Sequence, residues 1–176
     1  MNTRDLLIEI GTEELPPKAL RRMRDALQTT LLGLLAENNL AHADSEAFAT
    51  PRRLALLGRD VPESQPDRDI TTRGPALKAA IDEAGKPTKP AEGFARSCGV
   101  AVSDLEELHT DKGSWLVFHS RETGQYTTDI VPGLLEKALN QLPMPKRMRW
   151  GNSDIEFVRP LHWMLILFGE EPVKAT

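Results

Sequence analysis

The sequence predicts an α+β protein with a mainly antiparallel sheet, two long amphipathic helices and two or three short helices. Two observations lead to this fold class. Two segments have apolar residues at helical spacing over several turns, and short apolar runs with the character of strands lie before and after each of them. The resulting order is strand, helix, two strands, short helices, strand, helix and strand, and such a mixture is typical of α+β proteins.

The first strand and the first long helix follow one another directly. Residues 5–11 alternate loosely between polar and apolar side chains and end at Gly11, which predicts a strand. The helix is predicted to begin at Pro16 or Pro17, because proline suits the first turn of a helix. Its apolar residues then recur at helical spacing as far as about Asn38.

Two short strands are predicted at 45–50 and 53–61, on either side of a turn that contains a proline. The residues that follow, 62–73, are polar and include two prolines, so we expect a flexible loop there. With 176 residues, the chain is expected to form either one compact unit or two small subdomains.

Two short helices, a strand and the second long helix come next. The short helices are predicted at 75–84 and about 89–97, and each stops before a glycine. Residues 114–122 are predicted to form a strand. Apolar residues at helical spacing from Val131 to Leu142 predict the second long helix, which two prolines close. The last predicted strand is the apolar run 161–168.

Composition and charge exclude several classes of protein. The chain is 40 % apolar and 27 % charged with a net charge of −4, close to an ordinary globular protein. No run of about 18 uncharged apolar residues occurs, so no membrane partner is expected. The sequence starts without a signal-peptide pattern and Cys98 is its only cysteine. We therefore expect a cytoplasmic protein without internal disulfides.

The apolar run 161–168 ends only eight residues before Thr176. Because a buried strand needs neighbours, two interpretations are open. The sequence is either a truncated piece of a longer chain or a domain that ends on a core strand.

Motifs of catalytic sites are mostly absent. The nearest match to a phosphate-binding P-loop, at 85–88, lacks the preceding glycine and has a proline where an amide donor is needed. The sequence has no serine-hydrolase elbow, and no two histidines have helical ligand spacing, so neither a serine nucleophile nor a metal site is expected. The adjacent carboxylates Glu13 and Glu14 favour a structural role at a helix start over acid–base catalysis.

Two clusters of basic residues are the best candidates for a binding site. Arginine can grip a phosphate through two donors, and tryptophan offers a face on which bases stack. The first cluster is Arg52 and Arg53, in the turn after Pro51. The second lies in 146–163, and its candidate members are Lys146, Arg147, Arg149, Trp150, Arg159, His162 and Trp163.

The same residues also fit an ordinary core with a charged rim. In that interpretation Trp150 and Trp163 are core residues and the arginines are solvated. Arg159 is the hardest to explain in this way, because it lies beside an apolar strand where a charge needs a partner. That partner is either a carboxylate or a phosphate, and the residues leave both possibilities open.

Four parts of the sequence carry a family resemblance that covers nearly the whole chain. They are 6–16, 49–55, 74–75 with 93–96, and 146–150 with 157–163. In order and spacing they resemble the N-terminal part of the β subunit of bacterial heterotetrameric glycyl-tRNA synthetases.

The resemblance implies that the chain handles tRNA and takes part in assembly of a glycine–tRNA ligase. It implies three partners: the tRNA for glycine, the α subunit and the remaining β-subunit domains. ATP and magnesium are then expected at the catalytic core of the α subunit, with no cofactor bound by this chain and no catalysis by it. The fold implied is a body-and-tail arrangement similar to that of archaeal-type CCA-adding enzymes.

Two other functions remain open from the sequence. One is a subunit-assembly module without direct RNA contact, in which the arginines form ion pairs or an interface. The other is an independent hydrolase, which requires Glu13, Glu14 and a histidine within hydrogen-bond reach around one pocket.

Overall fold

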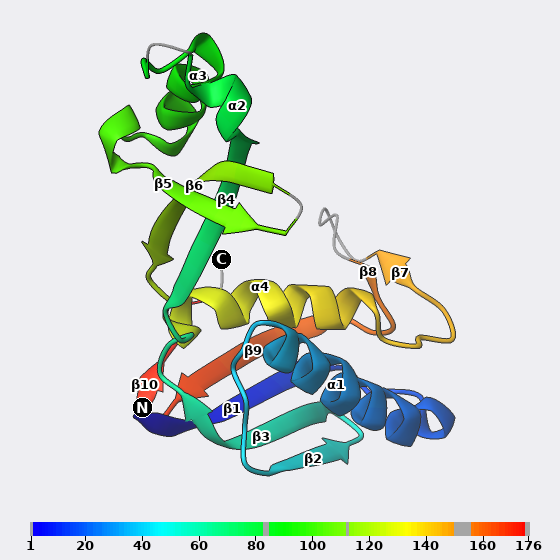
Figure 1. Ribbon diagram of the computed structural model, residues 1–176. Coiled ribbons are helices and arrows are strands. Elements are labelled where there is room, and N and C mark those ends of the chain that lie inside the picture. The colour runs from blue at the N-terminus through cyan, green and yellow to red at the C-terminus, as the bar shows by residue number, and fades with distance from the viewer. Residues whose placement is uncertain (1, 83–84, 112, 150–155, 175–176) are drawn as a thin grey trace. The chain divides into compact units, whose positions relative to one another are not determined.

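The chain folds into two compact units (Figure 1). The first unit contains Met1–Pro66 and Gln125–Thr176, and the second is the continuous segment Asp67–Gly124. Of the two arrangements that the sequence left open, the chain therefore has the one with two units. The computed structural model describes residues 2–82, 85–111, 113–149 and 156–174.

A five-stranded antiparallel sheet is the base of the first unit. Its strand order is β10–β9–β1–β3–β2. In the central strand β1, Ile8 pairs with Leu56 of β3 on one side and with Ile166 of β9 on the other. The strands are β1 Thr3–Thr12, β2 Ser45–Thr50, β3 Arg53–Pro62, β9 Leu161–Phe168 and β10 Glu171–Pro172.

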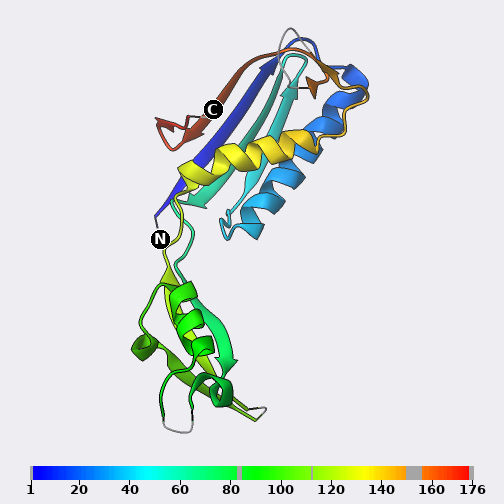
Figure 2. The same cartoon turned by 90° about the horizontal axis from the view of Figure 1, so that it is seen from above.

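The two long helices cover one face of this sheet (Figure 2). They are α1, Pro17–Glu37, and α4, Thr127–Asn140. Apolar residues at helical spacing, such as Met23 of α1, pack against Ile8 and Ile10 of β1 in one core. The predicted α+β class, with antiparallel sheets and two long helices, is confirmed.

α4 begins four residues before the apolar pattern that predicted it. The backbone N–H of Thr127 donates to the carbonyl oxygen of Glu63 at 2.9 Å, and its hydroxyl donates to that of Pro62 at 2.5 Å. These bonds anchor the helix start to the end of β3. A pattern of apolar residues could not predict these bonds, because Thr127 is polar and the bonds involve its backbone and hydroxyl.

The second unit is a three-stranded antiparallel sheet, in the order β4–β6–β5, with short helices packed on it. Its small core consists of Ala80, Ala91 and Leu116, with partly buried neighbours such as Phe94. The elements are β4 Arg68–Ala76, α2 Leu77–Ala80, α3 Lys89–Cys98, the 3₁₀ helix Val102–Asp104, β5 Glu106–Thr110 and β6 Gly113–Glu122.

The predicted flexible loop 62–73 was wrong for residues 68–73, which belong to β4. They pair with β6, from Arg68 with Glu122 to Arg73 with Val117. Side chains on both faces of this stretch are exposed, so the strand shows no alternation of apolar and polar residues. Pairing with β6, and not burial of one face, holds the strand in place. Only residues 63–67 lie between β3 and β4.

The predicted helix 75–84 was also wrong in its length. Its helical part is the single turn of α2, because Ile81 is already extended and forms a bridge with Pro87. Residues 83 and 84 lie outside the described part of the chain. The strands β5 and β10 and the ribbon of β7, Met148–Arg149, with β8, Glu156–Phe157, were not predicted. No helix in the described residues is both long and apolar enough to cross a membrane.

Candidate functional site

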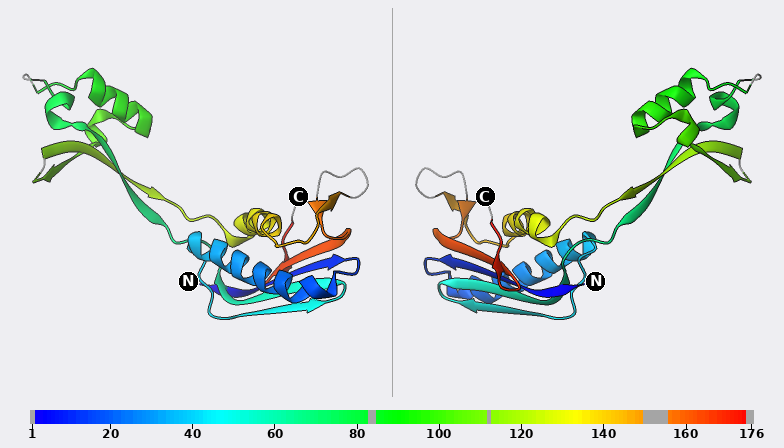
Figure 3. Two further views of the ribbon diagram at one scale, coloured as in Figure 1. Left: turned by 90° about the vertical axis from the view of Figure 1, so that its right-hand side faces the viewer. Right: turned by 90° about the vertical axis from the view of Figure 1, so that its left-hand side faces the viewer.

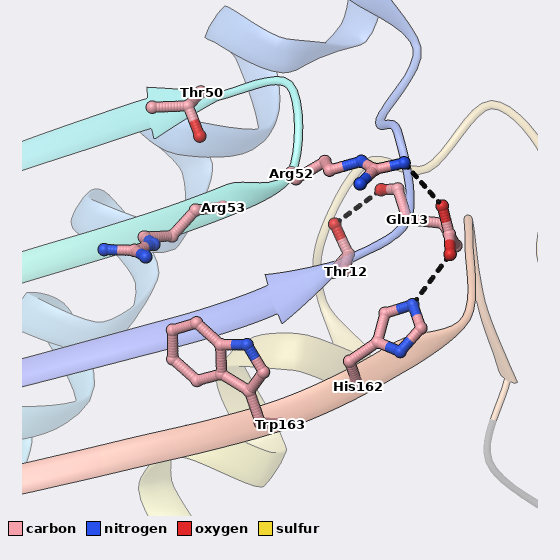
Figure 4. A pocket seen from close by; sticks show the side chains of 7 residues that line it. All are labelled: Thr12, Glu13, Thr50, Arg52, Arg53, His162 and Trp163. Carbon is pink, nitrogen blue, oxygen red and sulfur yellow. Dashed lines mark hydrogen bonds and ion pairs between the residues drawn. The ribbon is translucent and has the colours of Figure 1, made fainter.

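An open pocket of about 610 Å³ lies where the end of β1, the turn between β2 and β3, and the start of β9 meet (Figure 4). Backbone hydrogen bonds join these three segments. The N–H of Thr12 donates to the Arg52 carbonyl at 2.9 Å, and the N–H of Glu13 donates to the Pro160 carbonyl at 3.1 Å. The pocket is lined by Thr12, Glu13, Thr50, Arg52, Arg53, His162 and Trp163. It brings together members of both predicted basic clusters.

Glu13 lies between an arginine and a histidine in this pocket. One carboxylate oxygen is hydrogen-bonded to His162 Nε2 at 3.0 Å, and the other accepts from Arg52 Nη2 at 3.4 Å (Figure 4). Arg52 Nε also lies 4.0 Å from Glu14 Oε1. All of these side chains reach solvent, so their pairing orients Arg52 and His162 at the pocket and adds little stability.

Arg53 and Trp163 meet over Gly11. In the sheet, Gly11 of β1 pairs with Arg53 of β3 on one side and with Trp163 of β9 on the other. Because Gly11 has no side chain, the Arg53 guanidinium carbon reaches to 5.2 Å from the centre of the Trp163 ring, within cation–π range. Arg53 Nη1 also donates to Glu9 Oε1 at 3.1 Å. Trp163 is 43 % exposed and keeps indole surface available to a ligand.

Arg159 has a partner that the sequence did not predict. Its Nε donates to the backbone carbonyl of Glu14 at 3.1 Å, just before α1 begins. The expected partner was a carboxylate or a phosphate, on the argument that a charge beside an apolar strand needs one. The Arg159 side chain is exposed, so its charge does not require a carboxylate partner within the fold. This hydrogen bond joins the segment just before β9 to the segment just before α1.

The rest of the second cluster lies elsewhere. Arg147 and Arg149 line a separate groove of about 680 Å³ between α4 and the strands β7, β8 and β9. Arg147 donates to the Asn140 carbonyl at the end of α4, and Arg149 Nη2 lies 3.7 Å from Glu156 Oε1. Lys146 lines neither pocket. Trp150 lies outside the described residues.

Sequence reasoning missed Thr12 and Thr50 of the pocket lining, two further residues on β1, and one stack outside the site. Glu9 is hydrogen-bonded to Arg53, and Gly11 leaves the space in which Arg53 and Trp163 meet. The only signal in the sequence was that Glu9 and Gly11 alternate along one strand and so share a face. In the second unit, Arg73 stacks on Trp115 with its guanidinium carbon 3.5 Å from the ring centre. No signal pointed to that pair, because β4 was expected to be a loop.

The requirements for a hydrolase are met only in part. Glu13 and His162 are within hydrogen-bond reach in one pocket, but Glu14, which that interpretation also requires, does not line it. The neighbouring hydroxyl of Thr12 is buried and donates to the Glu13 carbonyl at 2.8 Å, so it does not point at a substrate. Within the described ranges, no three His, Cys, Asp or Glu side chains cluster as ligands for a metal.

Comparison with known proteins places this site in a family. The family described as glycyl-tRNA synthetase beta subunit matches residues 6–176. The chain belongs to this family. It is 51 % identical over 175 residues to the glycine–tRNA ligase beta subunit of Hahella chejuensis. The matched region covers 99 % of this chain and 25 % of that relative. The same-named protein of Edwardsiella ictaluri is 51 % identical over the whole chain and 26 % of its own length.

The beta subunit of Marinobacter nauticus, at 48 % identity, gives the same coverage as that of Hahella chejuensis. The chain therefore spans about a quarter of the length of the curated relatives it matches. The family assignment confirms the resemblance to glycyl-tRNA synthetase beta subunits that the sequence motifs indicated.

Proposed function

We propose that the chain is a tRNA-handling and assembly part of a glycine–tRNA ligase beta subunit in the cytoplasm. In this function it contacts the tRNA for glycine at the pocket around Glu13 and supports ATP-dependent attachment of glycine by the α subunit. ATP and magnesium are bound by that subunit's catalytic core, and this chain supplies no catalytic group. The remaining beta-subunit domains and the α subunit are its protein partners.

The Arg53–Trp163 pair at an open pocket is the observation that carries this proposal. A partly exposed indole offers a face on which an unpaired base can stack, as single-stranded RNA is commonly bound. Arg52 and His162 line the same pocket and supply further donors for a phosphate or a sugar hydroxyl. An aromatic platform with several donors is the chemistry that RNA recognition requires.

The ion pairs of the pocket do not prevent phosphate binding. Arg52 is paired with Glu13 and Arg53 with Glu9, and each arginine is about half exposed or more. Exposed pairs of this kind contribute only about 0.2–1 kcal/mol. Because these pairs are weak, a phosphate can replace a carboxylate at either guanidinium at little cost.

The same pairing also favours a second candidate, an assembly module without direct RNA contact. Every arginine that lines the pocket already has a carboxylate within 4.0 Å. In this alternative the pairs tie β1, β3 and β9 together, and the surface contacts protein. The two functions differ in whether tRNA affinity or subunit assembly responds to changes in the pocket.

A tRNA titration of the complete α–β enzyme at several salt concentrations distinguishes the two. Trp163→Ala is expected to weaken tRNA binding about tenfold, since loss of one stacked base removes about 1–3 kcal/mol. Arg53→Ala is expected to weaken it and to reduce its salt dependence. Arg59→Ala is a matched control, because Arg59 lies on the same strand with a similar ion pair to Asp5 but without a tryptophan.

Co-purification with the α subunit is measured for the same variants. Unchanged tRNA affinity in Trp163→Ala and Arg53→Ala would show that the pocket does not bind RNA. If those two variants also lose the α subunit, the assembly function is the correct one.

A further inference from the structure

The five-stranded sheet has an apolar face that the two long helices do not cover. We call it the outer face and define it by two rows of paired side chains across the strands. Six of its eight members are apolar. The rows are Glu46–Leu57–Leu7–Leu167 and Phe48–Ala55–Glu9–Leu165, in the strand order β2–β3–β1–β9.

Strand alternation separates this face from the core. Successive side chains of a strand point to opposite faces, and the intervening residues, such as Ile8, Leu56 and Ile166, are those that pack against α1 and α4. Figure 3 shows no element of the first unit on the outer side of the sheet. Within the described part of this unit, the outer face is therefore uncovered.

The outer face has the character of an interface more than of a solvated surface. An antiparallel sheet with one face in water normally alternates between apolar and polar residues, whereas β1, β3 and β9 carry leucines on both faces. Phe48 is 49 % exposed. The carboxylate of Glu9 is paired with Arg53, and Glu46 lies on the edge strand. Glu9 lies on the central strand, but Arg53 already neutralises its charge. A mostly apolar face whose central charge is paired fits a protein contact.

We propose that another segment of the full-length beta-subunit polypeptide docks on the outer face. The matched relatives are about four times as long as this chain, so three quarters of such a polypeptide is available to cover it. A covalently linked segment is held near the face and does not have to be captured from solution. A largely apolar contact also suits a permanent neighbour better than a partner that must be released.

The docked segment would border the pocket. The next row across the sheet is Thr50–Arg53–Gly11–Trp163, two residues along each strand from Phe48, Ala55, Glu9 and Leu165. This inference rests on the family assignment and on the outer face, and not on tRNA contact. It therefore stands or falls independently of the RNA experiment.

Thiol footprinting of the full-length beta subunit, read peptide by peptide by mass spectrometry, tests the proposal. In the absence of the α subunit, a thiol in Phe48→Cys is expected to react with a maleimide at least about tenfold more slowly than one in Leu108→Cys, because a covered thiol reacts only after local opening. Leu108 is the matched control, since it is 39 % exposed on β5 of the second unit.

Glu46→Cys gives a second measurement on β2 that removes no apolar side chain. Its thiol is also expected to react with the maleimide more slowly than that of Leu108→Cys. Rates equal to that of Leu108→Cys would overturn the proposal. Rapid labelling of Phe48→Cys that becomes slow only when the α subunit is added would also overturn it, because the occupant would then be the α subunit.

Discussion

The indole of Trp163 lies against the backbone of Gly11, so close that a Cβ on residue 11 would be 2.2 Å from the ring. Real Cβ atoms never approach other atoms so closely. The two residues are direct neighbours in the β1–β9 pairing. Glycine at this position is what lets the tryptophan lie across the sheet toward Arg53, and the geometry of the pocket depends on it.

Gly11→Ala is expected to push Trp163 off the sheet and to separate it from Arg53. Forcing an added methyl into a filled site destabilises a protein by about 1–3 kcal/mol. Urea unfolding measures the change. Gly33→Ala is the control, because Gly33 is in α1 with no atom within 4 Å of the added Cβ. Alanine there should stabilise by about 0.5–1 kcal/mol. Equal stability of Gly11→Ala and the wild type would contradict the contact.

Glu13→Gln is expected to tighten tRNA binding by the complete enzyme. The amide keeps the shape of the side chain but removes the negative charge that Arg52 and His162 share. Both groups are then free to face a phosphate, so affinity should rise a few-fold and fall more steeply with salt. Filter binding at three salt concentrations measures this. Affinity and salt slope unchanged from the wild type would mean that no phosphate approaches Glu13.

Acid is expected to weaken the second unit through Asp67. Hydrogen bonds from the Gly124 N–H and from Arg121 hold the pKa of this carboxyl below its ordinary value of 3.8. A lowered pKa means that the ionised carboxylate stabilises the fold above pH 3.8, and this stabilisation is lost as the pH falls through the folded pKa. Asp67→Asn should therefore be less stable at pH 7 and show a smaller loss of stability between pH 5 and pH 2.

The pH dependence of Asp67→Asn is measured by denaturant unfolding in a pH series. Asp69→Asn is the control, because Asp69 lies two residues further along, in β4, and the described residues give its carboxylate no hydrogen bond or ion pair. If Asp67→Asn and the wild type lost the same stability on acidification, the hydrogen bonds of the Asp67 carboxylate to Arg121 and Gly124 would not stabilise the second unit.

Gly74→Ala is expected to destabilise the second unit alone. An added Cβ at residue 74 would lie 2.4 Å from the ring of Phe94, which packs against the small core of that unit. Hydrogen exchange should show faster exchange in 67–124 with protection retained in β1 and β3. Gly93→Ala, in α3 with open space around the new Cβ, should not do so. Loss of protection in both units would show that they unfold together.

Periodicity predicted the elements that have one buried face. The apolar repeats of α1 and the run 161–168 identified a helix and a strand because their side chains face the core. β4 was missed over 68–73 because it has no buried face there. Its pairing partner β6 lies about fifty residues later, and a pattern within one segment cannot reveal such a partner.

The chemistry of the site was predictable, but its assembly was not. Arg52, Arg53, His162 and Trp163 were chosen for what guanidinium, imidazole and indole groups bind, and the fold brings these four together. Their meeting depends on β1 lying between β3 and β9 in one particular register. Arg147 and Arg149 belonged to the same stretch of sequence, yet the fold places them in a different groove.

The strand order of the first unit has a consequence for synthesis on the ribosome. β1 precedes β9 by most of the chain, yet the two are neighbours in the sheet. The second unit is continuous and can fold as soon as Gly124 has left the exit tunnel. Until β9 arrives, one edge of β1 has no partner, and a free apolar edge invites wrong pairing. Translation that stalls between Gly124 and Leu161 would thus leave a folded second unit beside an unfinished sheet, the species that a chaperone must protect.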